Sequence, residues 1–271
     1  MPESGKDAET MTNFVIGAQM YSVRDRCTNY EDMLACMKEL KAGGYNVCQL
    51  SGQSRDLTPD QLHALCEESG LECGATHVSF EQMEEDLDKV IAMHRTLGCA
   101  YPGIGGLPEK YRGSAEGFAE FARKAGVIAE KLLDHGMHFI YHSHHFEFKR
   151  LENGRFGYDV MLENSPPALQ YELDCFWAQV GGQNVTDRIR SLKGRMDVIH
   201  FKDMAVGSWD GFRMCPIGDG SMDYLSIMAA SDEIGVKYAF VEQDNAPESE
   251  SGSVPCLLRS LEYLKANGGR F

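Results

Sequence analysis

The sequence predicts a single closed (β/α)8 barrel over residues 14–271, preceded by a polar lead at 1–13. Three observations favour this fold class. The 271 residues match the roughly 250 that such a barrel needs. The chain repeats one unit, in which an amphipathic helix is followed by a glycine and a short β-rich run. Finally, the later runs end in His, Asp or Glu, and the carboxyl ends of the strands meet at one mouth of a barrel.

The glycines mark the expected helix-to-strand junctions, because the residue after a helix often takes the left-handed conformation. The interval between two of them, 136–194, has double length and contains a further strand, LQYEL, entered through Ser165-Pro166-Pro167. Together with an opening strand at 14–19, this makes eight strands. The junction glycines are Gly44, Gly70, Gly98, Gly136, Gly194 and Gly235.

The predicted helices carry apolar residues at three- and four-residue spacing, which is typical of a helix with one buried face. Strands that alternate with such helices are parallel and joined by right-handed crossovers. A doubly wound open sheet has a similar rhythm, but eight units with polar strand ends favour the closed barrel. The stripe residues are Phe118, Phe121, Ala125, Ile128, Ala129 and Leu132 in one helix, and Val254, Leu257, Leu258, Leu261 and Leu264 in the last.

Charge and cysteine content narrow the function classes. A net charge of −15 argues against binding to a nucleic-acid backbone, which requires clustered Lys and Arg. Nine cysteines without a CxxC pair indicate neither a disulfide framework nor a zinc ribbon, and suit a reducing compartment. The amino-terminal segment lacks the apolar region of a signal peptide, and no stretch approaches the roughly 20 apolar residues of a membrane helix. We therefore expect a cytoplasmic protein that binds neither nucleic acid nor a membrane.

Four apolar runs in the second half of the chain each close on acid or imidazole groups, at 139–148, 169–174, 198–203 and 239–244. Each residue alone would be an ordinary strand end, but four successive strands ending this way predict a shared site. Carboxylates with some imidazole suit a divalent metal. The candidate ligands are Glu147 or His142, together with Asp174, His200 and Glu242.

The strand pattern gives reasons for each candidate. Asp174 opens a loop, where it can bind a metal or cap the next helix. His200 and Lys202 share one face of their strand, and both are costly to bury unless a charge or a ligand meets them. Glu242 follows three apolar residues and, once buried, needs a cation or an ion pair.

The stretch 141–147, YHSHHFE, leaves two assignments open. By alternation His142 and His144 share one face, whereas Glu147 lies on the other until the strand ends. We predict Glu147 as the ligand and place His142 and His144 around the substrate, where histidine suits proton transfer at neutral pH. The reverse assignment, with His142 as the ligand, stays open.

Earlier strands end in polar groups that form either a polyol pocket or an ordinary barrel mouth. These are Gln19 and Tyr21 after the first strand and His77 after the third. No dinucleotide fingerprint, Walker motif, HExxH or GxSxG elbow indicates another chemistry.

The segments IGAQMYSVRD, YHSHHFEF, LQYELD, VIHFKD, PIGDGSMDY and FVEQD resemble the xylose-isomerase-like TIM barrels described as sugar phosphate isomerases/epimerases. That superfamily also contains inosose dehydratase, keto-sugar epimerases and lyases, and endonuclease IV. The resemblance runs from about residue 14 to the end of the chain. It implies a divalent ion, commonly manganese, magnesium, cobalt or zinc, held by Glu, Asp, His and Glu from strands five to eight.

Carried over, the metal set is Glu147 or His142, then Asp174, His200 and Glu242. Two departures concern the metal set and the substrate pocket. Many members have Glu in place of His142, and a His three residues after the strand-six Asp, where this chain has Trp177. We assign Trp177 to substrate binding. The second strand often ends in Glu, whereas this chain has Gln49.

The resulting hypothesis is an isomerase or epimerase of carbohydrate metabolism that acts on a small keto-sugar or polyol. The metal would polarise the substrate, a base would remove an α-proton to form an enediolate, and Lys202 would stabilise the oxyanion. A dehydratase or lyase that eliminates a β-oxygen from the same enediolate is the alternative. An AP endonuclease-like phosphodiesterase is opposed by the net charge, and a non-catalytic sugar-binding subunit by the intact candidate ligands. Homo-oligomerisation is compatible with this class.

Overall fold

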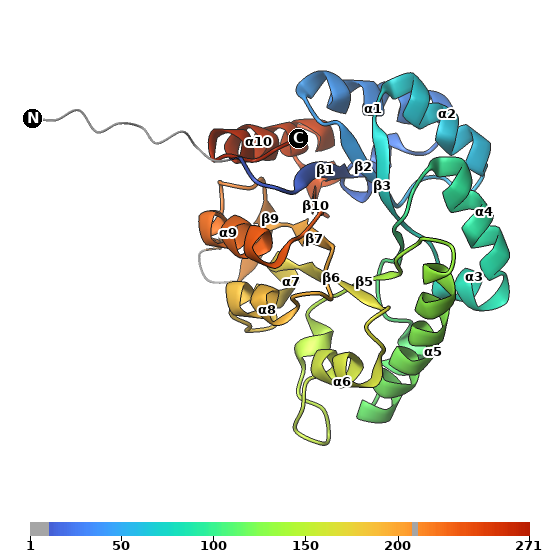
Figure 1. Cartoon of the computed structure of the whole chain (residues 1–271). Coiled ribbons are helices and arrows are strands. Elements are labelled where there is room, and N and C mark those ends of the chain that lie inside the picture. Colours follow the sequence, from blue (N-terminus) through green and yellow to red (C-terminus); the bar gives the residue numbers. More distant parts are fainter. Residues whose placement is uncertain (1–10, 208–210) are drawn as a thin grey trace, which may run out of the picture.

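A computed structural model describes residues 11–207 and 211–271. Eight parallel strands close into a barrel in the order β1-β10-β7-β6-β5-β4-β3-β2, which confirms the predicted (β/α)8 TIM barrel and excludes the open sheet (Figure 1). The barrel strands are β1 (Val15–Gln19), β2 (Val47–Leu50), β3 (Glu72–His77), β4 (Pro102–Ile104), β5 (Ile140–His142), β6 (Gln170–Asp174), β7 (Val198–Phe201) and β10 (Tyr238–Val241).

Helices surround the barrel, and each unit lies beside the preceding one around the ring (Figure 1). Left-handed glycines end several of them, as predicted, at Gly44, Gly70, Gly98 and Gly235. The helices are α1 (Tyr30–Gly43), α2 (Pro59–Ser69), α3 (Phe80–Glu85), α4 (Leu87–Leu97), α5 (Ala115–Leu133), α6 (Gly157–Asn164), α7 (Cys175–Val180), α8 (Val185–Ser191), α9 (Tyr224–Ile234) and α10 (Ser253–Ala266). Short 3-10 turns are η1 (Met20–Arg26), η2 (Glu109–Tyr111), η3 (Phe146–Phe148) and η4 (Ala246–Glu248).

Alternation along the strands divides the core into two parts. Outward-facing residues pack against the helices, and inward-facing ones fill the barrel with a small apolar cluster. Gly17 allows this filling, because a Cβ there would lie 2.7 Å from the Phe240 ring and 2.8 Å from the carbonyl oxygen of Val47. The inner cluster consists of Val47, Ala75, Tyr101, Ile140, Val198 and Phe240.

A polar layer lies above the apolar filling, at the carboxyl ends of the strands. The register sets Asp174 beside His200 and His142 beside Glu172. Since inward-facing positions recur every second residue, inward side chains at and just beyond the strand ends reach this layer. Its members are Gln19, Gln49, His77, His142, Glu172, Asp174, His200, Lys202 and Glu242.

A two-stranded antiparallel hairpin, β8 (Asp203–Val206) and β9 (Phe212–Cys215), follows β7 and was not predicted. Asp203 secures the loop after the hairpin, because its carboxylate accepts hydrogen bonds from the backbone N–H groups of Gly218 and Gly220 at 3.0 and 3.2 Å. The hairpin and this loop together follow the strand that carries His200.

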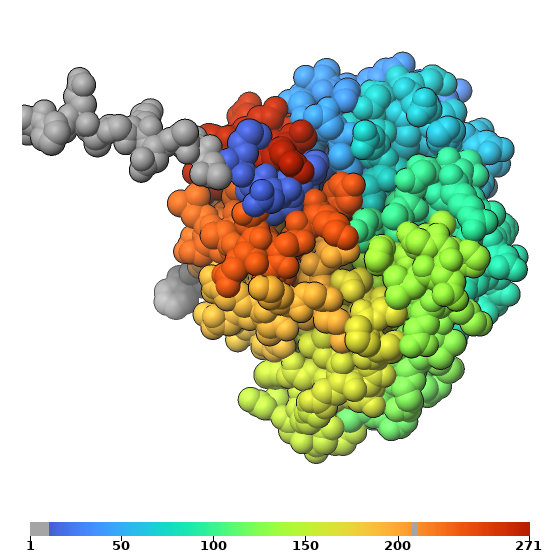
Figure 2. Space-filling view, in the orientation of Figure 1, coloured from blue at the N-terminus to red at the C-terminus, as the bar shows by residue number. Residues whose placement is uncertain are grey.

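The two ends of the described chain meet on the face opposite the polar layer. Thr12 N–H donates to the carbonyl of Gly268 at 2.9 Å, and Ile16 N–H donates to that of Arg270 at 2.7 Å. Figure 2 shows the blue and red segments in contact. Of the predicted lead at 1–13, residues 1–10 lie outside the described residues. Among the described residues, no helix has the length and apolar character needed to cross a membrane.

Candidate metal centre

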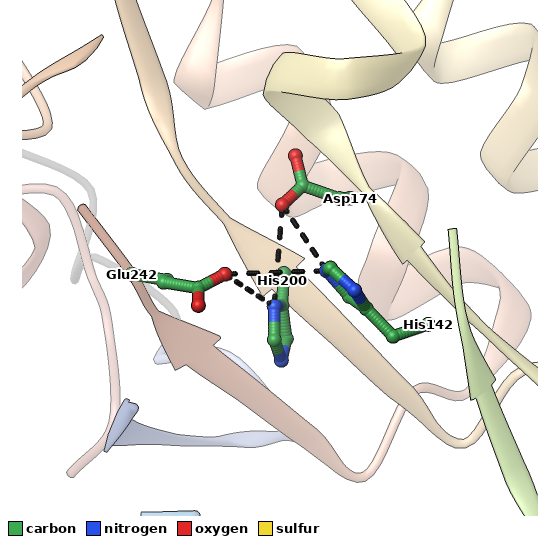
Figure 3. Close-up of side chains that lie close together, drawn as sticks. All are labelled: His142, Asp174, His200 and Glu242. Carbon is green, nitrogen blue, oxygen red and sulfur yellow. Dashed lines mark hydrogen bonds and ion pairs between the residues drawn. The ribbon is translucent and has the colours of Figure 1, made fainter. Parts of the chain in front are cut away.

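Four side chains from neighbouring strands converge at the carboxyl end of the barrel (Figure 3). His142 ends β5, Asp174 ends β6, His200 lies in β7 and Glu242 follows β10. One donor atom from each lies within 4.8 Å of the other three, and all four residues are buried. Two imidazole nitrogens and two carboxylate oxygens thus face a common point.

The separations between these donor atoms fit a small divalent ion. Glu242 Oε2 is 2.9 Å from His200 Nδ1, and Asp174 Oδ2 is 3.4 Å from His142 Nε2. The wider pairs, His142 Nε2 to Glu242 Oε2 and His200 Nδ1 to Asp174 Oδ2, are 4.0 Å apart. Ligands bound at about 2.0–2.2 Å lie about 3–3.5 Å from one another. A mixed nitrogen and oxygen set of this kind suits manganese, cobalt or zinc.

The ammonium of Lys202 already neutralises the two carboxylates of this group. Its Nζ lies 3.0 Å from Asp174 Oδ2 and 2.8 Å from Glu242 Oε2, and a third carboxylate, Asp244, is 3.1 Å away. Burial alone would lower the pKa of Lys202, but the carboxylates of Asp174 and Glu242 raise it above the ordinary lysine value. The same pair of oxygens is the one that would bind a metal ion, so Lys202 competes with the ion for them.

Asp174 caps the next helix and at the same time directs one carboxylate oxygen into the cluster. Its Oδ1 accepts a hydrogen bond from the backbone N–H of Trp177 at 2.9 Å and caps α7, while Oδ2 faces His142 and Lys202. The cap fixes the carboxylate, so that its second oxygen points into the cluster. Burial would raise the pKa of Asp174, but the charge of Lys202 outweighs burial and lowers it.

Glu172 is a buried carboxylate that the sequence interpretation missed. Its Oε2 lies 2.7 Å from His77 Nε2, and its Oε1 lies 3.0 Å from His200 Nε2. Burial would raise the pKa of Glu172, but the adjacent imidazoles of His200 and His77 lower it. Burial likewise opposes protonation of His200, whereas Glu172 and Glu242 raise its pKa to about 10. Alternation in LQYELD places Glu172 on the face of Asp174, and this signal could have identified it.

The structure does not bring Glu147 to the cluster, contrary to the preferred assignment. β5 ends at His142, and the following turn directs Glu147 to the outer face of the sheet. There its Oε1 accepts a hydrogen bond from Tyr141 Oη at 2.5 Å, and Oε2 accepts one from the backbone N–H of His144 at 3.0 Å. Burial raises the pKa of Glu147 to about 7. His142 occupies the position that the sequence left open between the two.

His144 and Trp177 lie beside the cluster. The His144 ring centroid is 4.8 Å from that of His142 and 5.8 Å from that of Trp177. Lys202 Nζ is 5.6 Å from the Trp177 ring centroid. Burial lowers the pKa of His144 to about 2, so the imidazole is neutral. Within the described part of the chain, His144 Nδ1 and Trp177 Nε1 are buried polar atoms without a hydrogen-bond partner.

The other predicted pocket residues take different places. Gln19 is buried and donates a hydrogen bond to Gln49 Oε1 at 3.1 Å, and His77 bonds to Glu172. Tyr21 is 37% exposed at the rim, with the guanidinium of Arg24 4.3 Å from its ring centroid, and is not part of the cluster. Gln19 and His77 therefore support the cluster from below.

Comparison with known proteins identifies the class of this protein. The chain belongs to the xylose isomerase-like TIM barrel family, whose model matches residues 37–265. A search of curated proteins finds no significant match.

Among solved structures, the fold is similar to a sugar phosphate isomerase/epimerase from Parabacteroides distasonis, with a TM-score of 0.78, 21% identity and coverage of 98% of each chain. A probable 3-DHS dehydratase from Bacillus anthracis is similar with a TM-score of 0.68 and 16% identity, over 93% of this chain and 99% of that one. A D-allulose 3-epimerase from Methylomonas matches with a TM-score of 0.67 and 14% identity, over 95% of this chain and 99% of the other.

Proposed function

We propose that this protein is a metal-dependent isomerase or epimerase that acts on a keto-sugar or polyol through an enediolate. The observation that carries the proposal is the buried convergence of His142, Asp174, His200 and Glu242, with Lys202 beside them. The family supports it, because the similar structures include a sugar phosphate isomerase/epimerase and a sugar 3-epimerase.

The four converging residues would hold the divalent ion, which when bound polarises the substrate carbonyl and a neighbouring hydroxyl and acidifies the α-C–H. Lys202 offers an ammonium at the same point, where it stabilises negative charge that develops on the substrate oxygen.

After these assignments, we propose His144 as the base that removes the substrate α-proton. His142 belongs to the metal set, and Glu147 faces the outside of the sheet. His144 lies beside both His142 and Trp177, and its buried Nδ1 has no hydrogen-bond partner among the described residues, so this nitrogen is available to a substrate in the mouth. The unpartnered Nε1 of Trp177 can donate to a substrate hydroxyl.

A dehydratase or lyase is the second candidate, and the similarity to the probable 3-DHS dehydratase favours it. The first step is the same removal of an α-proton, after which a β-oxygen leaves the enediolate. The protonated Lys202 can supply the proton that the departing oxygen needs.

The test is turnover of a panel of keto-sugars and 3-keto-glycosides in deuterium oxide, followed by NMR. We expect solvent deuterium at the reacting carbon, and an alkene product if elimination follows. His144→Asn should lower the rate about 10²–10⁴-fold with metal still bound. The surface variant His135→Asn is the control and should keep the full rate. Products without deuterium would exclude a solvent-exchanging base and indicate hydride shift.

A further inference from the structure

We propose that Gln49 and Glu172 are positioning residues that hold His200 with its Nε2 protonated, so that Nδ1 is the atom presented to the metal. This inference rests on the proposed metal-dependent function and concerns the layer directly beneath the cluster. His200 Nε2 lies 2.6 Å from Gln49 Oε1 and 3.0 Å from Glu172 Oε1. Its Nδ1 lies on the other side, 2.9 Å from Glu242 Oε2.

The orientation of the Gln49 amide follows from a backbone group. Tyr21 N–H can only donate, and it lies 2.8 Å from Gln19 Oε1. The other end of the Gln19 amide, Nε2, must then donate to its neighbour at 3.1 Å, which is Gln49 Oε1. The oxygen of Gln49 therefore faces Gln19 and His200.

The amide nitrogen of Gln49 independently indicates the same orientation. A buried carboxylate that is ionised can only accept hydrogen bonds, and Glu172 Oε1 lies 2.8 Å from Gln49 Nε2. The pair would repel if the amide were flipped, because two oxygens would then meet. Gln19 and Glu172, on different strands, thus favour the same amide orientation, which leaves Gln49 Nε2 3.0 Å from His77 Nε2.

His200 is the end of this directed series of hydrogen bonds. Both atoms that meet its Nε2 are acceptors, namely the oxygen of Gln49 and the carboxylate of Glu172. Nε2 must therefore carry a hydrogen, and in the neutral ring the lone pair is on Nδ1. His77 completes the arrangement from the far side, because its Nε2 at 2.7 Å anchors the second oxygen of Glu172.

The consequence is that the ring orientation is fixed before a metal arrives, with Nδ1 directed toward the cluster. A histidine that exchanges tautomers freely presents an N–H group, and not a lone pair, to the ion part of the time. A carboxylate that accepts a hydrogen bond from the other ring nitrogen also makes the ligand histidine more basic. Gln19, Gln49, Glu172 and His200 are all fully buried, so water does not compete for the ring.

Cadmium-113 NMR of the wild-type protein tests which nitrogen binds. Cadmium on Nδ1 couples through three bonds only to Hε1 of the ring, whereas cadmium on Nε2 couples to both Hε1 and Hδ2. We expect the single coupling for His200, assigned by its absence in His200→Gln. Coupling to both ring protons would overturn the inference while leaving the metal site intact. Failure of the wild type to bind any metal would instead refute the proposed function.

Variants test whether Gln49 and Glu172 are responsible. Glu172→Gln and Gln49→Leu should weaken cadmium and manganese binding about 10–100-fold in calorimetry. Gln170→Leu, on the same face of β6 but farther from the cluster, is the matched control. Unchanged affinity in Glu172→Gln, with a wild-type melting curve, would contradict the positioning role.

Discussion

At the scale of single residues, Lys202 affects how strongly the cluster binds a cation. Its ammonium contacts the carboxylates of Asp174 and Glu242 and thus competes with a metal for them. Lys202→Met should therefore raise metal affinity, by about tenfold or more, because a positive charge about 3 Å from the ligands is removed. Turnover should fall, since the oxyanion loses its partner. Calorimetry and rate measurements check both parts, with exposed Lys149→Met as control. Weaker metal binding would show that Lys202 supports the site instead.

The carboxylates should be essential for retaining the metal. Glu242→Ala and Asp174→Ala each remove one of two anionic ligands, and metal content measured after dialysis should fall below stoichiometric. The fold should persist, because Lys202 keeps two of its three carboxylate partners in either variant. Asp244→Asn, outside the group of four, is the control and should retain metal. Stoichiometric metal in the Ala variants would disprove the ligand set.

Glu147 should affect stability rather than metal binding. Its pKa is about 7 in the fold and near 4.5 when unfolded. Below pH 4.5 both states are protonated, so Glu147 does not lower the free energy of unfolding. As pH rises from 4.5 to 7, only the unfolded state ionises readily, and the wild type should lose about 3 kcal/mol relative to Glu147→Gln. Urea unfolding at several pH values measures this difference. A difference between Glu147→Gln and the wild type that stays constant with pH would contradict the burial argument.

The sequence predicted most positions of site residues in and next to strands, where side chains alternate between two faces, but not those farther beyond the strand ends. Asp174, His200 and Glu242 could be predicted to lie together because each lies at or near the carboxyl end of an apolar strand. Glu147 was misplaced because β5 ends at His142, and alternation has no meaning beyond a strand end. Glu172 was not predicted because it lies within β6, two residues before the acid that ends the strand. The hydrogen-bond series through Gln49 depends on contacts between strands far apart in sequence, which no local pattern contains.

At the scale of elements, the loop after the β8–β9 hairpin depends on one close approach. A Cβ on Gly220 would lie 2.2 Å from Asp203 Oδ1, so Gly220→Ala must displace the carboxylate that holds the loop. We expect a loss of about 1–3 kcal/mol in urea unfolding, typical of overpacking. Gly113→Ala is the matched control, because a Cβ there meets nothing within 4 Å. Equal stability of the two variants would show that the loop rearranges without a loss of stability.

The hairpin itself could not be predicted from the pattern of the barrel. β9 is short, and its residues Phe212 and Arg213 are exposed, so it lacks the buried alternation that marks a strand. By contrast, the eight barrel strands and the glycine junctions were predictable, because burial on both faces and helix endings leave strong local signals.

At the scale of the whole molecule, stability should not depend on disulfides. All nine cysteines are free and buried, and burial raises the pKa of Cys36 and Cys215 to about 12, which suppresses their reactivity. The melting temperature should be the same with and without a thiol reductant. Nine thiols should react with Ellman's reagent in urea, and few in the native protein. A lower melting temperature in reductant would reveal a cross-link.

Because the two chain ends lie together, the chain could begin at a different β/α unit and still form the same barrel. Residues 12 and 268 share a backbone hydrogen bond on the face opposite the metal cluster. A circularly permuted chain could therefore join residue 271 to residue 12 and open new ends at Gly136, where an added Cβ meets nothing within 4 Å. Both sets of ends would lie on the amino-terminal face of the strands. The order of the units could thus be changed, or the barrel fused to another domain, without passing any segment across the mouth that carries the cluster.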